Sequence, residues 1–251
     1  MKVDAKGVFK DNQKLFLSMG AVVILSMLIA SATSQNVFNF WDLNGSATGP
    51  LNPVGNNNNG GNNSGDLPEP VSNGKNNAYN NPPPTVINRG SDYSARISTN
   101  MGSIELDLYQ DEAPEAVNNF VFLAQENFYD GTSFHRVIEG FIIQGGDPKG
   151  DGTGGPGYEL SLESDPTLKF EPFVIAMSEG SGANDAHGSQ FFITSREFDS
   201  NTLDGKYTIF GFVTGGFTIV DKIESQTVYQ GNSEYRPLNP IIINDIEIVE
   251  N

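Results

Sequence analysis

Hydrophobic and polar residues alternate in short runs along most of the C-terminal two thirds of the chain. Ile104, Leu106 and Leu108 alternate with charged residues, and a turn at residues 100–102 separates this run from a similar one at 94–99. Alternation with a period of two is typical of strands that bury one face. The two runs therefore predict a β-hairpin. Further runs of this kind predict strands at residues 133–138, 141–144, 173–177, 190–194, 208–212 and 241–249.

Two segments repeat their apolar residues at helical spacing instead. The first begins near Pro114, which fits the first turn of a helix, and places Val117, Phe120 and Val121 on one face. The second spans residues 216–224. Many short strands with two helices in about 160 residues predict a mostly β fold, a closed antiparallel barrel capped by two α-helices.

A different pattern opens the chain, where residues 15–32 read LFLSMGAVVILSMLIASA without a charge. About 20 helical residues, and no fewer than about 17, cross the hydrocarbon core of a bilayer. Lysines at four positions precede the run, which favours a cytoplasmic N-terminus. Two interpretations are open: a transmembrane anchor after a short basic cytoplasmic segment (1–14), or a signal peptide cleaved near Ala32. Both predict a domain outside the cytoplasm, either membrane-anchored or secreted.

Residues 33–90 separate this run from the predicted barrel. Within them, residues 44–90 contain 14 Asn, 8 Gly and 7 Pro, with sparse apolar residues and no period. Such a composition buries too little apolar surface to offset the entropy of ordering. We expect residues 33–90 to form a disordered linker, and residues 91–251 to form the folded domain.

Charge and cysteine content narrow the possible functions. Residues 91–251 hold 8 Lys and Arg against 26 Asp and Glu, so this segment repels phosphate backbones and is not expected to bind nucleic acid. The chain has no cysteine, which excludes disulfides and thiolate zinc sites. His135 and His187 lack metal-ligand spacing, so no metal site is expected, and His135 is expected to be a hydrogen-bonded structural residue.

Three motifs carry a family resemblance. They are FHRVIEGFIIQGGD at residues 134–147, GSQFFIT at 188–194 and LDGKYTIFG at 203–211. In sequence, order and spacing they resemble the cyclophilin family of peptidyl-prolyl cis-trans isomerases, and the resemblance extends over about residues 93–249. It implies an eight-stranded barrel with a helix at each end, a monomeric domain, no cofactor, and proline-containing segments of client proteins as substrates.

The chemistry of X–Pro rotation explains why one arginine of these motifs matters. Rotation breaks amide resonance across a barrier of about 18–20 kcal/mol. The twisted amide regains a localised lone pair on nitrogen, so a cation that donates a hydrogen bond there stabilises it selectively. The resemblance assigns this role to Arg136. The alternative is a structural pair between Arg136 and a carboxylate on the same sheet.

The resemblance also assigns the remaining site residues. Phe141 and Gln144 join Arg136 as catalytic residues. Substrate-binding positions fall on Ile142, Ser178, Gln190, Phe192, Leu203 and Tyr207. Two positions depart from the common family pattern, because Thr202 replaces a tryptophan and Tyr207 replaces a histidine, and the loop at residues 177–188 is longer.

Two functions from different classes fit these residues. The first is a membrane-tethered enzyme that assists folding of extracytoplasmic proteins by isomerising X–Pro bonds. The second is a proline-peptide binding module or scaffold with little turnover.

Overall fold

The structure, a computed structural model, covers the C-terminal part of the chain. The described residues are 68–88, 90–179, 187–199, 201–229 and 235–251. They belong to one compact unit, Asn57–Asn251, whereas the other unit, Met1–Asn56, contains the predicted span 15–32 and lies outside them. No helix within these described ranges is long and apolar enough to cross a membrane.

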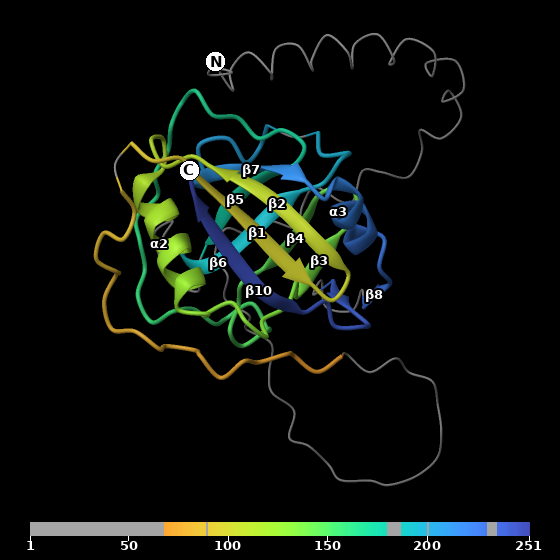
Figure 1. The fold of residues 1–251 in the computed structure, drawn as a ribbon. Helices are drawn as coiled ribbons and strands as arrows, with labels where there is room; N and C mark the ends of the chain where they lie inside the picture. The colour runs from red at the N-terminus through yellow and green to blue at the C-terminus, as the bar shows by residue number, and fades with distance from the viewer. Residues whose placement is uncertain (1–67, 89, 180–186, 200, 230–234) are drawn as a thin grey trace, which may run out of the picture. The chain divides into compact units, whose positions relative to one another are not determined.

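Antiparallel strands dominate the described part, and helices α2 and α3 lie on opposite sides of them (Figure 1). In chain order the elements are β1 (Tyr93–Thr99), β2 (Gly102–Leu108), α2 (Pro114–Gln125), β3 (Arg136–Ile138), β4 (Ile142–Gly145), β5 (Val174–Glu179), β6 (His187–Thr194), β7 (Ile209–Gly215), α3 (Phe217–Glu224), β8 (Val228–Tyr229), β9 (Arg236–Pro237) and β10 (Ile243–Glu250).

The large sheet has the strand order β10-β1-β2-β7-β5-β6-β4-β3 and curls into a half-barrel. The predicted closure of the barrel is wrong, because its two edge strands, β10 and β3, do not form a ladder. The backbone N–H of Val137 in β3 donates instead to the Tyr235 carbonyl (2.9 Å), beside β9. The segment before β3 meets the start of β10 through an isolated bridge between Ser133 and Ile242.

Strand β3 is shorter than predicted, and strands β8 and β9 were not predicted. Residues 133–138 were predicted as one strand, but the ladder is confined to Arg136–Ile138. Strands β8 and β9 have two residues each, and β9 contains Pro237, which lacks an N–H for a ladder. Strands this short carry no alternation that a pattern could reveal.

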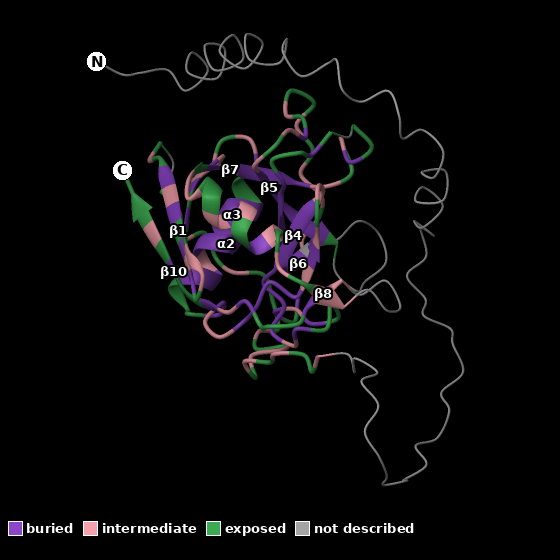
Figure 2. Ribbon diagram, turned by 90° about the vertical axis from the view of Figure 1, so that its right-hand side faces the viewer, coloured by how far each residue is buried: buried purple, intermediate pink, exposed green. Residues whose placement is uncertain are grey.

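The main core lies between the inner face of the sheet and α2. The alternation predicted for β2 is confirmed, because Ile104, Leu106 and Leu108 are at most 3% exposed. Figure 2 shows the buried residues gathered on the central strands, with the edge strand β10 more exposed. Phe120 of α2 packs its ring against Phe191 of β6 (5.8 Å between centroids), and this contact joins helix and sheet.

Helix α2 begins without a capping side chain of its own, because Ala113 precedes it. The carboxylate of Glu163 accepts hydrogen bonds from the backbone N–H groups of Glu115 (3.0 Å) and Ala116 (2.7 Å). A negative charge at this end also complements the helix dipole. A residue 48 positions away thus stabilises the start of the helix.

Residues 68–88, which we call the strap, fall in the predicted linker but pack against the domain. They run past α2 in Figure 1, where they are drawn in orange and yellow. Asn118 of α2 donates to the Pro84 carbonyl (3.0 Å) and accepts from the Val86 N–H (2.7 Å). Tyr79 and Val86 pack on the main core. These apolar anchors are too widely spaced to form a period, so composition analysis does not detect them.

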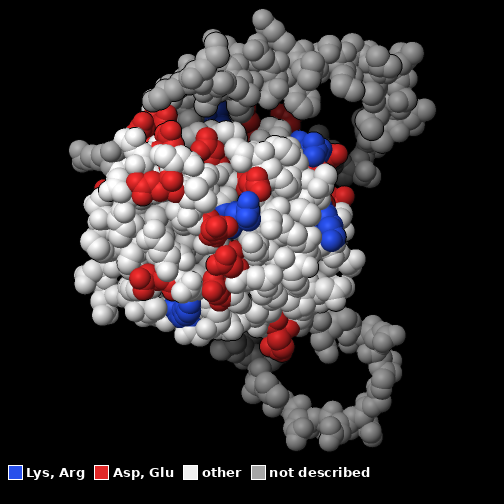
Figure 3. Space-filling model, in the orientation of Figure 1, with Lys and Arg blue, Asp and Glu red and all other residues white. Residues whose placement is uncertain are grey.

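Acidic side chains outnumber basic ones on the face shown in Figure 3. Arg96 lies between Glu105 and Glu247, 3.5 Å from each, and all three side chains are about half exposed. Exposed pairs of this kind add little to stability.

Candidate active site

One row of residues crosses four neighbouring strands on the face opposite the main core. Strand register pairs Arg136 of β3 with Gln144 of β4, and Gln144 with Phe192 of β6. Phe192 in turn pairs with Ala176 of β5. Neighbours such as Val137, Ile143 and Phe191 belong to the main core instead, since successive side chains of a strand face opposite ways. A cation, an amide and an aromatic ring therefore stand side by side.

The polar side chains of this face form a continuous hydrogen-bonded chain. Arg136 Nη1 donates to Gln144 Oε1 (3.2 Å). Gln144 Nε2 donates to Ser178 Oγ (3.1 Å) and to Gln190 Oε1 (3.0 Å). Gln144, Ser178 and Gln190 are all buried, so these bonds fix their orientation.

An apolar cluster adjoins the polar chain and is separate from the main core. Five predicted site residues belong to it or pack against it: Phe141, Ile142, Phe192, Leu203 and Tyr207. The ring of Tyr207 stands edge-on to Phe192, with 5.3 Å between centroids and an interplanar angle of 90°. The sheet thus brings the predicted site residues together on one face.

Arg136 has no carboxylate within salt-bridge distance among the described residues. The alternative of a structural Arg–carboxylate pair is therefore not observed. Burial lowers the pKa of the Arg136 guanidinium, while the nearby hydroxyls of Tyr207 and Tyr235 act in the opposite direction. An arginine stays protonated at neutral pH, so this face carries a positive charge that pairs with no carboxylate of the described residues.

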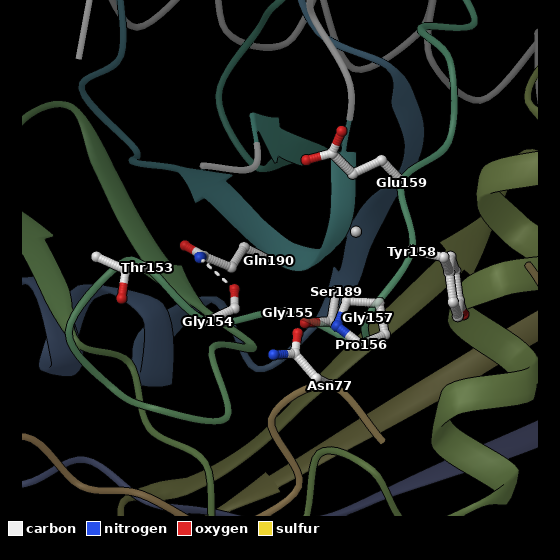
Figure 4. Close-up of a pocket in the computed structure, with 11 residues that line it drawn as sticks. Asn77, Thr153, Gly154, Gly155, Pro156, Gly157, Tyr158, Glu159, Ser189 and Gln190 are labelled. Atoms are coloured by element: carbon white, nitrogen blue, oxygen red, sulfur yellow. Dashed lines mark hydrogen bonds between the residues drawn. The ribbon is translucent and has the colours of Figure 1, made fainter. Parts of the chain in front are cut away.

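A cavity of about 400 Å³ opens next to Gln190. Its lining includes Asn77 of the strap, Thr153 and Glu159 (Figure 4). Gln190 Nε2 donates to the Gly154 carbonyl at its edge (2.9 Å). Within the described ranges, no group of three or more His, Asp or Glu residues could hold a metal ion.

Comparison with known proteins assigns the family. Residues 94–248 match the family described as cyclophilin type peptidyl-prolyl cis-trans isomerase/CLD. The chain belongs to this family. A probable peptidyl-prolyl cis-trans isomerase A of Mycobacterium leprae is 44% identical over 174 residues, which cover 62% of this chain and 91% of the relative. Peptidyl-prolyl cis-trans isomerase B of Streptomyces anulatus is 42% identical over 173 residues, covering 61% and 95%.

Solved structures agree with this assignment. A cyclophilin type peptidyl-prolyl cis-trans isomerase of Cryptosporidium parvum is similar with a TM-score of 0.58 and 36% identity, covering 64% of this chain and 99% of that one. The same protein was also solved in the presence of the dipeptide Ala-Pro. The predicted cyclophilin fold and enzyme class are thus confirmed, whereas the roles of individual residues stay predictions.

Two aromatic residues of this cyclophilin's apolar cluster were not predicted. Phe170 stacks on Phe192 (5.8 Å, 14°), and Phe198 stacks on Phe141 (5.6 Å, 22°). Both lie in loops, each as a single aromatic next to charged residues, Lys169 and Glu171 in one case. An aromatic ring in such a polar loop is a signal that could have pointed to them.

The departures from the family pattern fall around this cluster. Tyr207, at a position where a histidine is common, contributes its ring to the wall. Thr202 is exposed. In the longer loop at 177–188, Met177 and Ser178 lie in β5, but residues 180–186 lie outside the described part.

His135 is buried immediately before β3. Neither ring nitrogen makes a hydrogen bond of standard geometry among the described residues, although the Ser133 backbone lies close enough to act on the His135 pKa as a hydrogen-bond partner. The hydrogen bonding expected of His135 stays a prediction. Burial lowers the pKa of His135 to about 4; Asp147 and the Ser133 backbone oppose this shift, and Arg136 and Arg236 add to it. The ring is therefore neutral at pH 7.

This burial predicts a pH-dependent stability. A histidine in the unfolded chain has a pKa near 6.5, whereas His135 in the folded protein has a pKa of about 4. As the pH falls from 6.5 toward 4, the unfolded chain therefore takes up a proton that the folded protein does not, and the free energy of unfolding decreases. Between pH 7 and pH 5 the wild type is expected to lose about 2 kcal/mol more unfolding free energy than His135→Gln. Urea unfolding of both proteins at the two pH values measures this difference. Equal losses would contradict the prediction.

Proposed function

We propose that this cyclophilin accelerates cis–trans rotation about X–Pro bonds of client proteins, with Arg136 as the catalytic cation. One observation carries the proposal: a charged guanidinium, without a carboxylate partner among the described residues, stands beside a dry aromatic wall. Such a cation is available to a substrate rather than neutralised by the protein.

In the proposed mechanism, Arg136 donates a hydrogen bond to the prolyl nitrogen as the amide twists. In the planar amide the nitrogen lone pair is delocalised and accepts a hydrogen bond poorly. The hydrogen bond from Arg136 therefore strengthens as the amide twists toward the transition state. Uncatalysed rotation takes tens to hundreds of seconds, and reaching milliseconds requires roughly 6–7 kcal/mol of selective stabilisation. No covalent bond changes, and the mechanism needs no cofactor.

The apolar cluster supplies the second contribution. Phe141 and Tyr207, which are partly exposed, offer a surface against which a proline ring can pack, and Phe192 and Leu203 are buried in the same cluster. Contact with this wall removes water from the amide. A hydrogen bond from Arg136 is stronger in that environment than in water.

Gln144 acts in this proposal as a positioning residue for Arg136. Both hydrogen bonds donated by its amide stay inside the protein, and its oxygen accepts from the guanidinium. The arginine side chain has high rotamer freedom, and a fixed acceptor reduces the entropy lost on substrate binding.

Proline-containing segments are the proposed substrates. The relative from Cryptosporidium parvum was solved in the presence of the dipeptide Ala-Pro, which supports a proline-containing peptide as the ligand of this chain. A peptide containing Ala-Pro is therefore the first substrate to test.

We further propose that the clients are extracytoplasmic and that residues 15–32 export or anchor the domain. The support is the uncharged run with its preceding lysines, and the polar segment that follows it. Cell fractionation with N-terminal sequencing tests this. Recovery of the intact chain in the soluble cytoplasmic fraction would contradict it.

The isomerase function is tested by exchange NMR on an Ala-Pro peptide, with wild type compared with Gln144→Ala. Wild type is expected to exceed the uncatalysed rate by several orders of magnitude. The variant is expected to lose about 10- to 100-fold in kcat/KM, because Arg136 loses its acceptor and two buried partners are left unpaired. Ser98→Ala in β1, away from this face, is the matched control and should leave the rate unchanged.

A proline-peptide binding module gives a different result in the same experiment. The peptide would bind, as seen by shifted resonances, but its cis–trans exchange would stay at the uncatalysed rate. That outcome would reject the isomerase function and support a binding module or scaffold.

A further inference from the structure

The strap lies outside the part of the chain that matches the family. It comprises residues 68–88, whereas the match begins at residue 94. Its contacts nevertheless connect it to the hydrogen-bonded side chains Arg136, Gln144 and Gln190 of the candidate active site. The contacts fall into four groups, made with the loop at residues 148–157, with α2 and its C-terminal turn, with the chain near β10, and with Arg236 of β9, which donates to the Pro68 carbonyl (2.7 Å).

The strap pairs with the loop at residues 148–157 almost as an added strand. The backbone N–H of Asn77 donates to the Gly155 carbonyl (3.0 Å), and the N–H of Tyr79 donates to the Pro156 carbonyl (2.8 Å). The Gly155 N–H in turn donates to the side-chain oxygen of Asn76 (3.0 Å). Both polar groups of the Gly155 backbone are thus satisfied by the strap.

Two glycines of the loop permit this close approach. Gly157 has φ +107°, and a Cβ there would lie 2.1 Å from the Tyr79 carbonyl oxygen. Gly150 has φ +70°, and a Cβ there would lie 2.3 Å from the Val71 carbonyl oxygen. Any larger residue would force the strap away from the loop.

The strap is itself held on the side of α2. Asn73 Nδ2 donates to the carbonyls of Phe128 (2.8 Å) and Asp130 (3.1 Å). The Tyr79 ring packs edge-on against Phe122, with 5.3 Å between centroids. These contacts give the strap a fixed position from which to hold the loop.

The opposite side of the same loop holds Gln190. Gln190 Nε2 donates to the carbonyls of Gly152 (3.0 Å) and Gly154 (2.9 Å), the second of which is drawn in Figure 4. Gln190 Oε1 accepts from Gln144, and Gln144 accepts from Arg136. Gly154 and Gly155 are adjacent, so an unbroken series of bonds connects Asn76 to the catalytic cation.

We propose that the strap is a positioning element of the active site, in which Asn76 fixes the glycine loop that orients Gln190, Gln144 and Arg136. The proposal rests on the isomerase function proposed above. It assigns a role in catalysis to a segment that precedes the family's matched region. Asn77 reinforces the arrangement, since its backbone bonds the loop while its side chain lines the cavity beside Gln190.

Three single variants of the full-length chain test the role of Asn76. Asn76→Ala removes the acceptor of the Gly155 N–H and is expected to lower kcat/KM about 3- to 10-fold. The melting temperature is expected to change little. Asn76→Asp keeps an acceptor oxygen and is expected to restore most of the activity. Asn88→Ala, at the exposed end of the strap where the side chain bonds Glu250, is the matched control.

A double-mutant cycle separates positioning from general stabilisation. If Asn76 acts through Gln190, Asn76→Ala should have little further effect on kcat/KM in a Gln190→Ala background. A full, additive loss in that background would overturn the proposal. So would equal activities of Asn76→Ala and wild type.

A readout without substrate keeps this test independent of the isomerase assay. The side-chain amide protons of Gln190, followed by NMR, are expected to exchange faster with water in Asn76→Ala than in wild type, and to be unchanged in Asn88→Ala. An inactive wild type with this response would reject the isomerase function while retaining the loop contact. Unchanged exchange in Asn76→Ala would reject the positioning role, whatever the activity.

Discussion

Replacing Arg136 with alanine is expected to lower kcat/KM for X–Pro isomerisation about 100- to 1000-fold, the usual cost of removing a donor that stabilises transition-state charge. Arg136 is the cation of the proposed site, and its Nη1 is oriented by Gln144 at 3.2 Å. The fold should persist, because Arg136 lies on the short edge strand β3 and is only half-buried. Exchange NMR on an Ala-Pro peptide measures the rate, and circular dichroism checks the fold.

Two further variants sharpen this result. Arg136→Lys keeps a positive charge but loses the planar fork, so it should recover a small part of the activity. Arg196→Ala removes an arginine that pairs with Asp221 (2.9 Å) outside the apolar cluster, and should leave kcat/KM within about twofold. Near wild-type activity of Arg136→Ala would refute the proposed mechanism.

Replacing Phe191 with alanine is expected to lower the unfolding free energy by about 3–5 kcal/mol. Phe191 is fully buried, and its ring contacts those of Phe120, Tyr129 and Phe134 at 5.7–6.1 Å between centroids. The substitution leaves a cavity where α2 meets the sheet. Urea unfolding measures the loss as a lower midpoint at a nearly unchanged slope.

The matched control for Phe191 is another phenylalanine with a different exposure. Phe217 at the start of α3 is 37% exposed and packs against Phe173. Phe217→Ala is therefore expected to lower the unfolding free energy by less than about 1.5 kcal/mol. Similar losses for Phe191→Ala and Phe217→Ala would show that the main core is not organised as described.

Burial patterns within single strands and helices were predictable because they are local. Alternation placed Ile104 and Leu106 on the inner face, and helical spacing placed Val117 and Phe120 in the core, as the structure confirms. The pattern could not show that β3 would be limited to three residues, because Phe134, just before it, donates to the Ile241 carbonyl, more than 100 positions later.

Candidate site residues were predicted through motifs, yet their partners were not. The motifs predict Arg136, Gln144 and Gln190 as site residues. They do not show that the side-chain amide of Gln144 bonds both of the others, since Gln144 and Gln190 are 46 positions apart. Phe170 and Phe198 were missed because loop residues follow no period that would place them beside Phe192 and Phe141.

The sequence by itself determined the family, the enzyme class, and which face of the β1–β2 hairpin and of α2 is buried. These properties depend on residue type and on spacing within short segments. Tertiary structure decided the open edge of the barrel, the capping of α2 by Glu163, and the packing of the strap beside the glycine loop. Each depends on a contact between groups far apart in the chain, and composition gave the opposite prediction for the strap. The Asn- and Pro-rich strap is ordered where a few of its side chains, Tyr79 and Asn73 among them, contact the folded domain.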